Sequence, residues 1–208
     1  MYLAAFDTET GGLDPSEQDL LTFYMAILDE DLKILDEIDL KLKPNDRLPI
    51  TTASAMEINK IDLKRHLEDP ETLTYSDGKE RLVTFLNKYH KKTGKYNNLR
   101  PLGQNVDFDI QFTQHHLLPK SEWDKLFHYG KVDTKQIVDF LKDCTFLPER
   151  LGSLITIVEH FGIPKRNAHS AKDDTLMMID VYKTLIALMK SKKDGGQSQD
   201  LISLLEAE

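Results

Sequence analysis

Residues 1–13, MYLAAFDTETGGL, decide the fold predicted for this 208-residue chain. The apolar run over residues 2–6 is typical of a buried strand, and Gly11-Gly12 would end it. Because side chains alternate along a strand, Asp7 and Glu9 should point to the same face. Two adjacent carboxylates repel each other, and a hard divalent cation with oxygen ligands would neutralise them. Acidic residues at a strand end can also cap a turn in water, so the pair alone leaves both interpretations open.

Further strands and helices are predicted downstream of this first strand. Residues 20–28 and 33–43 should form two more strands, which give a three-stranded meander with the first. Shorter strands are predicted at residues 99–103 and 132–133. Helices are expected at residues 54–59, 77–92, 106–118, 135–142, 149–161 and 170–189. Strands that come first and then alternate with helices predict an α/β fold, with a mixed five-stranded sheet flanked by helices.

The bulk composition is that of a globular domain, with 40% hydrophobic and 30% charged residues. We expect one domain over residues 1–190, followed over residues 191–208 by a polar, glycine-rich linker and a short apolar tail. No apolar stretch approaches the ~18 residues of a membrane span, and no signal peptide is expected. The single cysteine, Cys144, excludes an internal disulfide and predicts a reducing, cytoplasmic location. A net charge of −8 argues against nonspecific wrapping of duplex DNA.

A second acidic position stands at the start of the last predicted helix. Apolar residues follow Asp174 at helical spacing, at Met177, Met178, Val181 and Leu185. A carboxylate on such a buried face is costly unless it is paired or bound to metal. It could instead be a first-turn acid that the helix dipole stabilises. His169, five residues earlier, should lie in a loop, either as a surface histidine or as a general base.

Three motifs occur in a fixed order: Asp7-x-Glu9, then Asn105-x-x-Phe108-Asp109, then His169 followed five residues later by Asp174. In this combination they resemble the DnaQ-like, or DEDDh, 3′–5′ exonucleases, a family with a ribonuclease H-like fold. That family includes polymerase proofreading subunits, ribonuclease T and oligoribonuclease. Periodicity does not choose between Asp107 and Asp109, and it is the resemblance that assigns Asp109, directly after the phenylalanine.

The resemblance implies a metal-dependent nuclease. Asp7, Glu9, Asp109 and Asp174 would hold two Mg²⁺ or Mn²⁺ ions, and His169 would take a proton from the attacking water. Nucleoside 5′-monophosphates would leave single-stranded DNA 3′ ends, in proofreading or repair. The resemblance also implies substrate contacts from Thr10, Gly11, Leu13, Asn59, Gln104, Asn105 and Phe108. Asn59 stands where histidine is common in the proofreading branch, and Gln104 stands where many members carry histidine before the asparagine.

Two other functions stay open at this point. One is an exoribonuclease that trims RNA 3′ ends or short oligoribonucleotides, and the other is a noncatalytic replisome adaptor that keeps only the fold. The tail adds a question about partners. Residues 199–205 resemble the glutamine-led, leucine-rich peptides that dock on bacterial sliding clamps, which makes a clamp or a polymerase a candidate partner. The same residues could also be a frayed extension with no partner.

Overall fold

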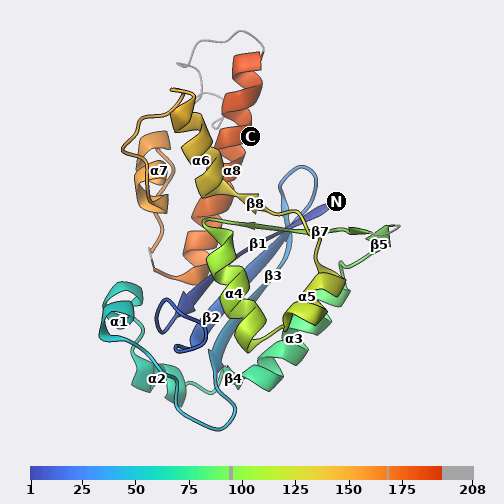
Figure 1. Cartoon of the computed structure of the whole chain (residues 1–208), viewed down its shortest axis with the longest axis vertical. Helices are drawn as coiled ribbons and strands as arrows, with labels where there is room; N and C mark the ends of the chain where they lie inside the picture. The colour runs from blue at the N-terminus through green and yellow to red at the C-terminus, as the bar shows by residue number, and fades with distance from the viewer. Residues whose placement is uncertain (94–95, 168, 194–208) are drawn as a thin grey trace.

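The computed structural model describes residues 1–93, 96–167 and 169–193. Its centre is a mixed sheet (Figure 1). Six strands form it, in the order β4 (Thr72–Thr74), β3 (Ile34–Lys43), β2 (Leu20–Leu28), β1 (Tyr2–Thr10), β7 (Leu99–Gly103) and β8 (Val132–Asp133). The first three strands of the chain form an antiparallel meander, whereas β4, β7 and β8 each lie parallel to the neighbour that they join.

The mixed α/β fold predicted from the sequence is confirmed, and its central sheet has one strand more than expected. The additional strand, β4, has three residues and pairs with the last residues of β3. A strand of three residues is too short for an alternating pattern to stand out in the sequence. It extends the sheet at the edge farthest from β8.

Alternating side chains of β1 build two apolar layers, one on each face of the sheet. Phe6 joins the larger core beneath α3 (Tyr75–Asn87), α4 (Val106–His116) and α5 (Lys120–Leu126). Ala5 faces the opposite way and packs with residues of α8 (Ala171–Lys193). A third apolar cluster joins α8 to α6 (Thr134–Asp143) and α7 (Leu154–Phe161). The first strand therefore lies between two helical layers.

The remaining elements lie around this core. The helices α1 (Ala53–Asn59) and α2 (Leu63–Glu68) lie near the end of the sheet toward which β1 runs (Figure 1). A separate two-stranded ribbon pairs β5 (Lys92–Thr93) with β6 (Tyr96–Asn97). Among the described helices, none combines the length and the apolar character that crossing a membrane requires.

Three helix boundaries differ by four or five residues from the sequence prediction, and the short helices α2 and α5 were not predicted. The helix expected over residues 77–92 ends at Asn87. The helix expected from residue 149 begins at Leu154, because Ser153 and Thr156 form a capping box that fixes its start. The last helix continues to Lys193 instead of ending at residue 189. The apolar tail predicted at residues 199–205 lies outside the described residues, so its proposed role stays a prediction.

Candidate active site

The site is built on the second half of β1. Asp7 and Glu9 both face the layer formed by α8, while Thr8 between them faces the opposite layer and is buried. The pairing of β1 with β7 ends at Ala5 opposite Leu102, whereas its pairing with β2 continues to Thr10. The carboxylate-bearing half of β1 therefore extends beyond the end of its pairing with β7.

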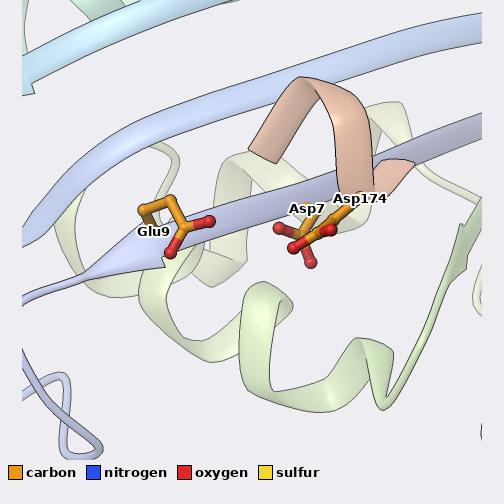
Figure 2. A group of neighbouring side chains, drawn as sticks. All are labelled: Asp7, Glu9 and Asp174. Atoms are coloured by element: carbon orange, nitrogen blue, oxygen red, sulfur yellow. The ribbon is translucent and has the colours of Figure 1, made fainter. Parts of the chain in front are cut away.

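The first turn of α8 brings a third carboxylate to this strand. Oxygens of Asp7, Glu9 and Asp174 all lie within 4.8 Å of one another. Figure 2 shows the carboxylates of Asp7 and Asp174 side by side, with Glu9 farther along the strand. Asp174 lies in the first turn of α8, where the partial positive charge of the helix N-terminus favours an acid. The sequence left open whether Asp174 is a first-turn acid or a member of a charged cluster. In the structure it is both.

The fourth predicted ligand, Asp109, lies in the first turn of α4 and is 3% exposed. Its Oδ1 accepts hydrogen bonds from the backbone N–H of Thr8 at 3.0 Å and from the Thr8 hydroxyl at 2.7 Å. Asp107, two residues earlier, forms an ion pair with Lys131 instead. The structure therefore places Asp109 against β1, the strand of Asp7 and Glu9, and pairs Asp107 with Lys131, a choice that the periodicity of the helix did not decide.

Burial makes all four carboxyl groups harder to ionise, and the charges of neighbouring acids add to this at Asp7 and Glu9. Burial, followed by the charges of Asp109, Glu9 and Asp174, raises the pKa of Asp7 well above its usual value. Burial and the charges of Asp174 and Asp109 raise the pKa of Glu9 to about 8. Burial raises the pKa of Asp109 to about 7, although the two hydrogen bonds from Thr8 oppose this. Burial also raises the pKa of Asp174, against the opposing effect of the His169 backbone N–H.

This donor set suits a hard divalent cation. All the clustered ligand atoms are carboxylate oxygens, the type that Mg²⁺ and Mn²⁺ prefer. Half-buried acids at these distances need a positive charge to be ionised together, because their mutual repulsion is weakly screened. Asp7, Glu9 and Asp174 therefore form a candidate metal centre, and the Asp109 carboxylate lies close enough to act on their charge.

His169 lies at the rim of the cluster. Its backbone N–H donates to Oδ2 of Asp174 at 3.1 Å, and its side chain is exposed. The residue has φ +69°, in the left-handed region that an L-residue rarely adopts. This turn places the histidine directly before α8, next to the predicted metal ligand five residues later.

The predicted substrate turn continues from β1. Leu13 is 85% exposed, whereas Thr10 is buried and its hydroxyl donates to the carbonyl of Gly12 at 2.6 Å. Asn59 is buried at the end of α1, and its amide donates to the carbonyl of Thr10 at 3.1 Å. The Asn59 side chain thus supports the turn by binding the backbone of Thr10, and Leu13 is the predicted contact on this turn that is open to solvent.

The other predicted contacts lie at the start of α4. Asn105 is exposed and adopts φ +60° as the residue before the helix. Gln104 accepts a hydrogen bond from the Thr134 hydroxyl, and Phe108 is half-buried against Phe112 at a ring distance of 5.0 Å. Of these three, Asn105 is the most accessible.

Sequence reasoning did not find two groups that hold the site in place. Asp133, at the end of β8, accepts from the N–H groups of Asn105 at 2.9 Å and Val106 at 3.2 Å, and so caps α4. Glu37 on β3 binds both the Tyr24 hydroxyl at 2.7 Å and Lys172 at 2.6 Å. Because Lys172 lies in the first turn of α8, this bridge ties the helix start to the sheet. No motif marks these residues, since their partners are distant in sequence.

Known proteins support the same assignment. The family model for exonucleases of the RNase T type matches residues 4–182. A search among curated proteins gives no match.

Solved structures of exonuclease I share the fold. The E. coli enzyme in complex with a dT13 oligonucleotide has a TM-score of 0.67 and 18% identity, over 92% of this chain and 42% of that one. A zinc-bound E. coli complex with single-stranded DNA has a TM-score of 0.70 and 20% identity, over 98% and 42%. Exonuclease I of Methylocaldum szegediense has a TM-score of 0.69 and 21% identity, over 92% and 41%.

The chain thus spans about two fifths of the length of these solved structures. At these identities the likeness shows the fold, and the family follows from the match over residues 4–182. The resemblance stated from the three sequence motifs is confirmed: the chain belongs to the RNase T exonuclease family.

Proposed function

We propose that the chain is a metal-dependent 3′–5′ exonuclease that releases nucleoside 5′-monophosphates from single-stranded DNA. One observation carries the proposal: β1, α4 and α8 bring four carboxylates with raised pKa values to one place. Gathering like charges is costly for folding, and strongly perturbed acids in a group are a mark of a working site. The exonuclease family match supports the same reading.

Asp7, Glu9, Asp109 and Asp174 would hold two divalent cations, either Mg²⁺ or Mn²⁺. When bound, such ions neutralise the phosphate and make a bound water more acidic. His169 accepts the proton of the attacking water from its exposed position beside Asp174. The turn at residues 10–13 and the start of α4 hold the terminal nucleotide, with Leu13 against its base.

Single-stranded DNA is the favoured substrate because the E. coli exonuclease I structures with the same fold hold DNA oligonucleotides. The deciding experiment is digestion of matched DNA and RNA oligonucleotides, single- and double-stranded, with Mg²⁺ and with Mn²⁺. We expect stepwise shortening of single-stranded DNA from its 3′ end, with no activity in EDTA. His169→Ala should lower turnover ~10²-fold or more while binding of a 3′ end persists.

Other outcomes of this experiment decide against the proposal. Faster digestion of RNA than of DNA would make the chain an exoribonuclease. No digestion of any substrate, with Mn²⁺ binding intact, would favour a noncatalytic adaptor. Equal activity of Asp7→Asn and wild type would point to a contaminating nuclease.

The tail supports a separate proposal about a partner. Residues 199–205 begin six positions after α8 ends at Lys193, so a docking peptide there could reach a sliding clamp while the nuclease domain works. Deleting residues 195–208 should abolish clamp binding in calorimetry and leave hydrolysis of a short oligonucleotide unchanged. No heat of binding from the intact protein would contradict this partner.

A further inference from the structure

A buried acid outside the catalytic cluster lies directly before β2. Asp19 is 0% exposed, and the guanidinium of Arg47 binds both of its oxygens, at 2.6 and 2.9 Å. The backbone N–H of Ile50 donates to the same carboxylate at 2.6 Å, and the Tyr75 hydroxyl donates at 3.1 Å. Burial opposes ionisation of this acid, but the bonds from Arg47, Ile50 and Tyr75 hold its pKa below the usual value. Asp19 is therefore a charged anchor for the segment that carries Arg47 and Ile50.

The backbone around this anchor holds the substrate turn. Gly11 donates its N–H to the carbonyl of Asp19 at 2.7 Å, and its own carbonyl accepts from the N–H of Thr52 at 2.7 Å. The N–H of Asp19 donates to the carbonyl of Ile50 at 3.1 Å. A Cβ added to Gly11 would lie 2.4 Å from that same carbonyl oxygen. The turn is thus packed tightly between the chain at residue 19 and the chain at residues 50–52.

The anchored segment returns to the turn a second time. Thr52 caps α1 through the N–H of Ala55 at 3.2 Å, and α1 ends at Asn59. The amide of Asn59 then donates to the carbonyl of Thr10 at 3.1 Å. Residues 47–59 therefore hold the turn at Gly11 and at Thr10, and their own start is fixed by Asp19.

We propose that Asp19 and Arg47 are positioning residues, which fix the turn at residues 10–13 where the 3′-terminal nucleotide binds. The inference rests on the proposed function of that turn. Asp19 has no exposed surface and acts on substrate only through the backbone that it holds. The Arg47 side chain is 48% exposed, so removing its guanidinium leaves a site that water can fill. Among the described residues, neither Asp19 nor Arg47 belongs to the cluster of Asp7, Glu9 and Asp174.

The test compares Arg47→Ala, Arg47→Lys, Asp19→Asn and the double variant in steady-state digestion of single-stranded DNA. Arg47→Ala and Asp19→Asn should each raise KM ~10-fold while kcat stays within about twofold, because a misplaced turn weakens binding of the 3′ end. The double variant should be no worse than either single variant, since both break one interaction. Arg47→Lys should recover part of the loss, and Mn²⁺ affinity should stay at the wild-type value in every variant. Arg65→Ala, which removes an exposed ion pair with Asp62 on α2, is the matched control.

Two results would overturn the proposal. If Arg47→Ala raises KM and Asp19→Asn does not, Arg47 contacts the substrate itself, because a fully buried acid cannot. If amide hydrogen exchange at Gly11 is unchanged in Arg47→Ala, the pair does not hold the turn. The exchange measurement needs no enzymatic activity, so it tests this inference even if the wild type is inactive. An inactive wild type would count against the proposed function instead.

Discussion

At the scale of single residues, folding brings acidic side chains of like charge close together at Asp7, Glu9, Asp109 and Asp174. Asp7 and Glu9 are held side by side by the strand, and Asp109 and Asp174 are brought to them by helix starts. Burial raises the pKa values of all four, and the charges of the neighbouring acids raise those of Asp7 and Glu9 further. This arrangement should cost stability in the metal-free protein, and a bound cation would relieve the repulsion.

This crowding of acids predicts how the metal-free protein responds to pH. The pKa of Glu9 rises from 4.5 to about 8 on folding, and that of Asp109 from 3.8 to about 7, so the folded state binds more protons than the unfolded state between these values. In EDTA, the melting temperature should therefore rise by ~5 °C as the pH falls from about 8 to about 5. Asp7→Asn should flatten this dependence. A melting temperature that falls over the same range would contradict the prediction.

The middle motif gives a second test between two neighbouring acids. Asp109→Asn should lower cleavage ~10³-fold, because Asp109 is bound to Thr8 on β1, between the proposed ligands Asp7 and Glu9. Asp107→Asn should cost less than about twofold, since it breaks only a partly exposed ion pair with Lys131. Initial rates on the same oligonucleotide check both variants, and circular dichroism controls for folding. The reverse order of the two effects would remove Asp109 from the site.

At the scale of elements, the site depends on where strands and helices begin and end. The register between β1 and β2 shifts between Glu9 and Thr10, where the strand gives way to the turn. α4 and α8 each present an acid from their first turn, and Asp133 and the Glu37–Lys172 bridge fix those helix starts. The proposed chemistry thus depends on where these caps and turns place the acids.

The turn offers a comparison between two glycines. Gly11→Ala should lower stability by ~1–3 kcal/mol, because its new Cβ would meet the Ile50 carbonyl at 2.4 Å and the backbone must move. Gly152→Ala is the matched control, since nothing lies within 4 Å of its Cβ position. Chemical denaturation of the two variants measures the difference. Equal stability of both would mean that the turn is not tightly packed.

At the scale of the whole molecule, the apolar cores form without help from the site. Three clusters of buried side chains lie on the two faces of the sheet and between α6, α7 and α8. None of them includes a predicted metal ligand. The fold should therefore survive in the absence of a cation, in contrast to small domains that need metal to fold.

Removal of metal tests this independence. In EDTA at neutral pH, the far-UV circular dichroism spectrum should stay that of the folded protein while digestion of DNA stops. Added Mg²⁺ or Mn²⁺ should restore digestion without changing the spectrum. Cooperative loss of the spectrum on chelation would show instead that the cation is part of the folding energy.

The sequence predicted the arrangement well where patterns are local. The strand at residues 2–10 with its two acids, and the apolar stripe that follows Asp174, were readable from alternation and helical spacing. The choice of Asp109 over Asp107 could not be made from such local spacing, because it depends on a hydrogen bond from Thr8, which is 101 positions away. Asp19, Asp133 and Glu37 were missed for the same reason. Their partners come from other elements, and no local spacing records such pairs.

The pair of bonds that Thr8 donates to Asp109 has a consequence for which ions the site accepts. Both bonds end on Oδ1, so Asp109 has its other oxygen to offer and is held against rotation. Ca²⁺ is large and favours carboxylates that can give both oxygens, whereas Mg²⁺ takes one oxygen from each in a strict octahedron. If Asp109 binds the ion as proposed, Thr8 would leave this carboxylate one oxygen for it and would so favour Mg²⁺ over Ca²⁺.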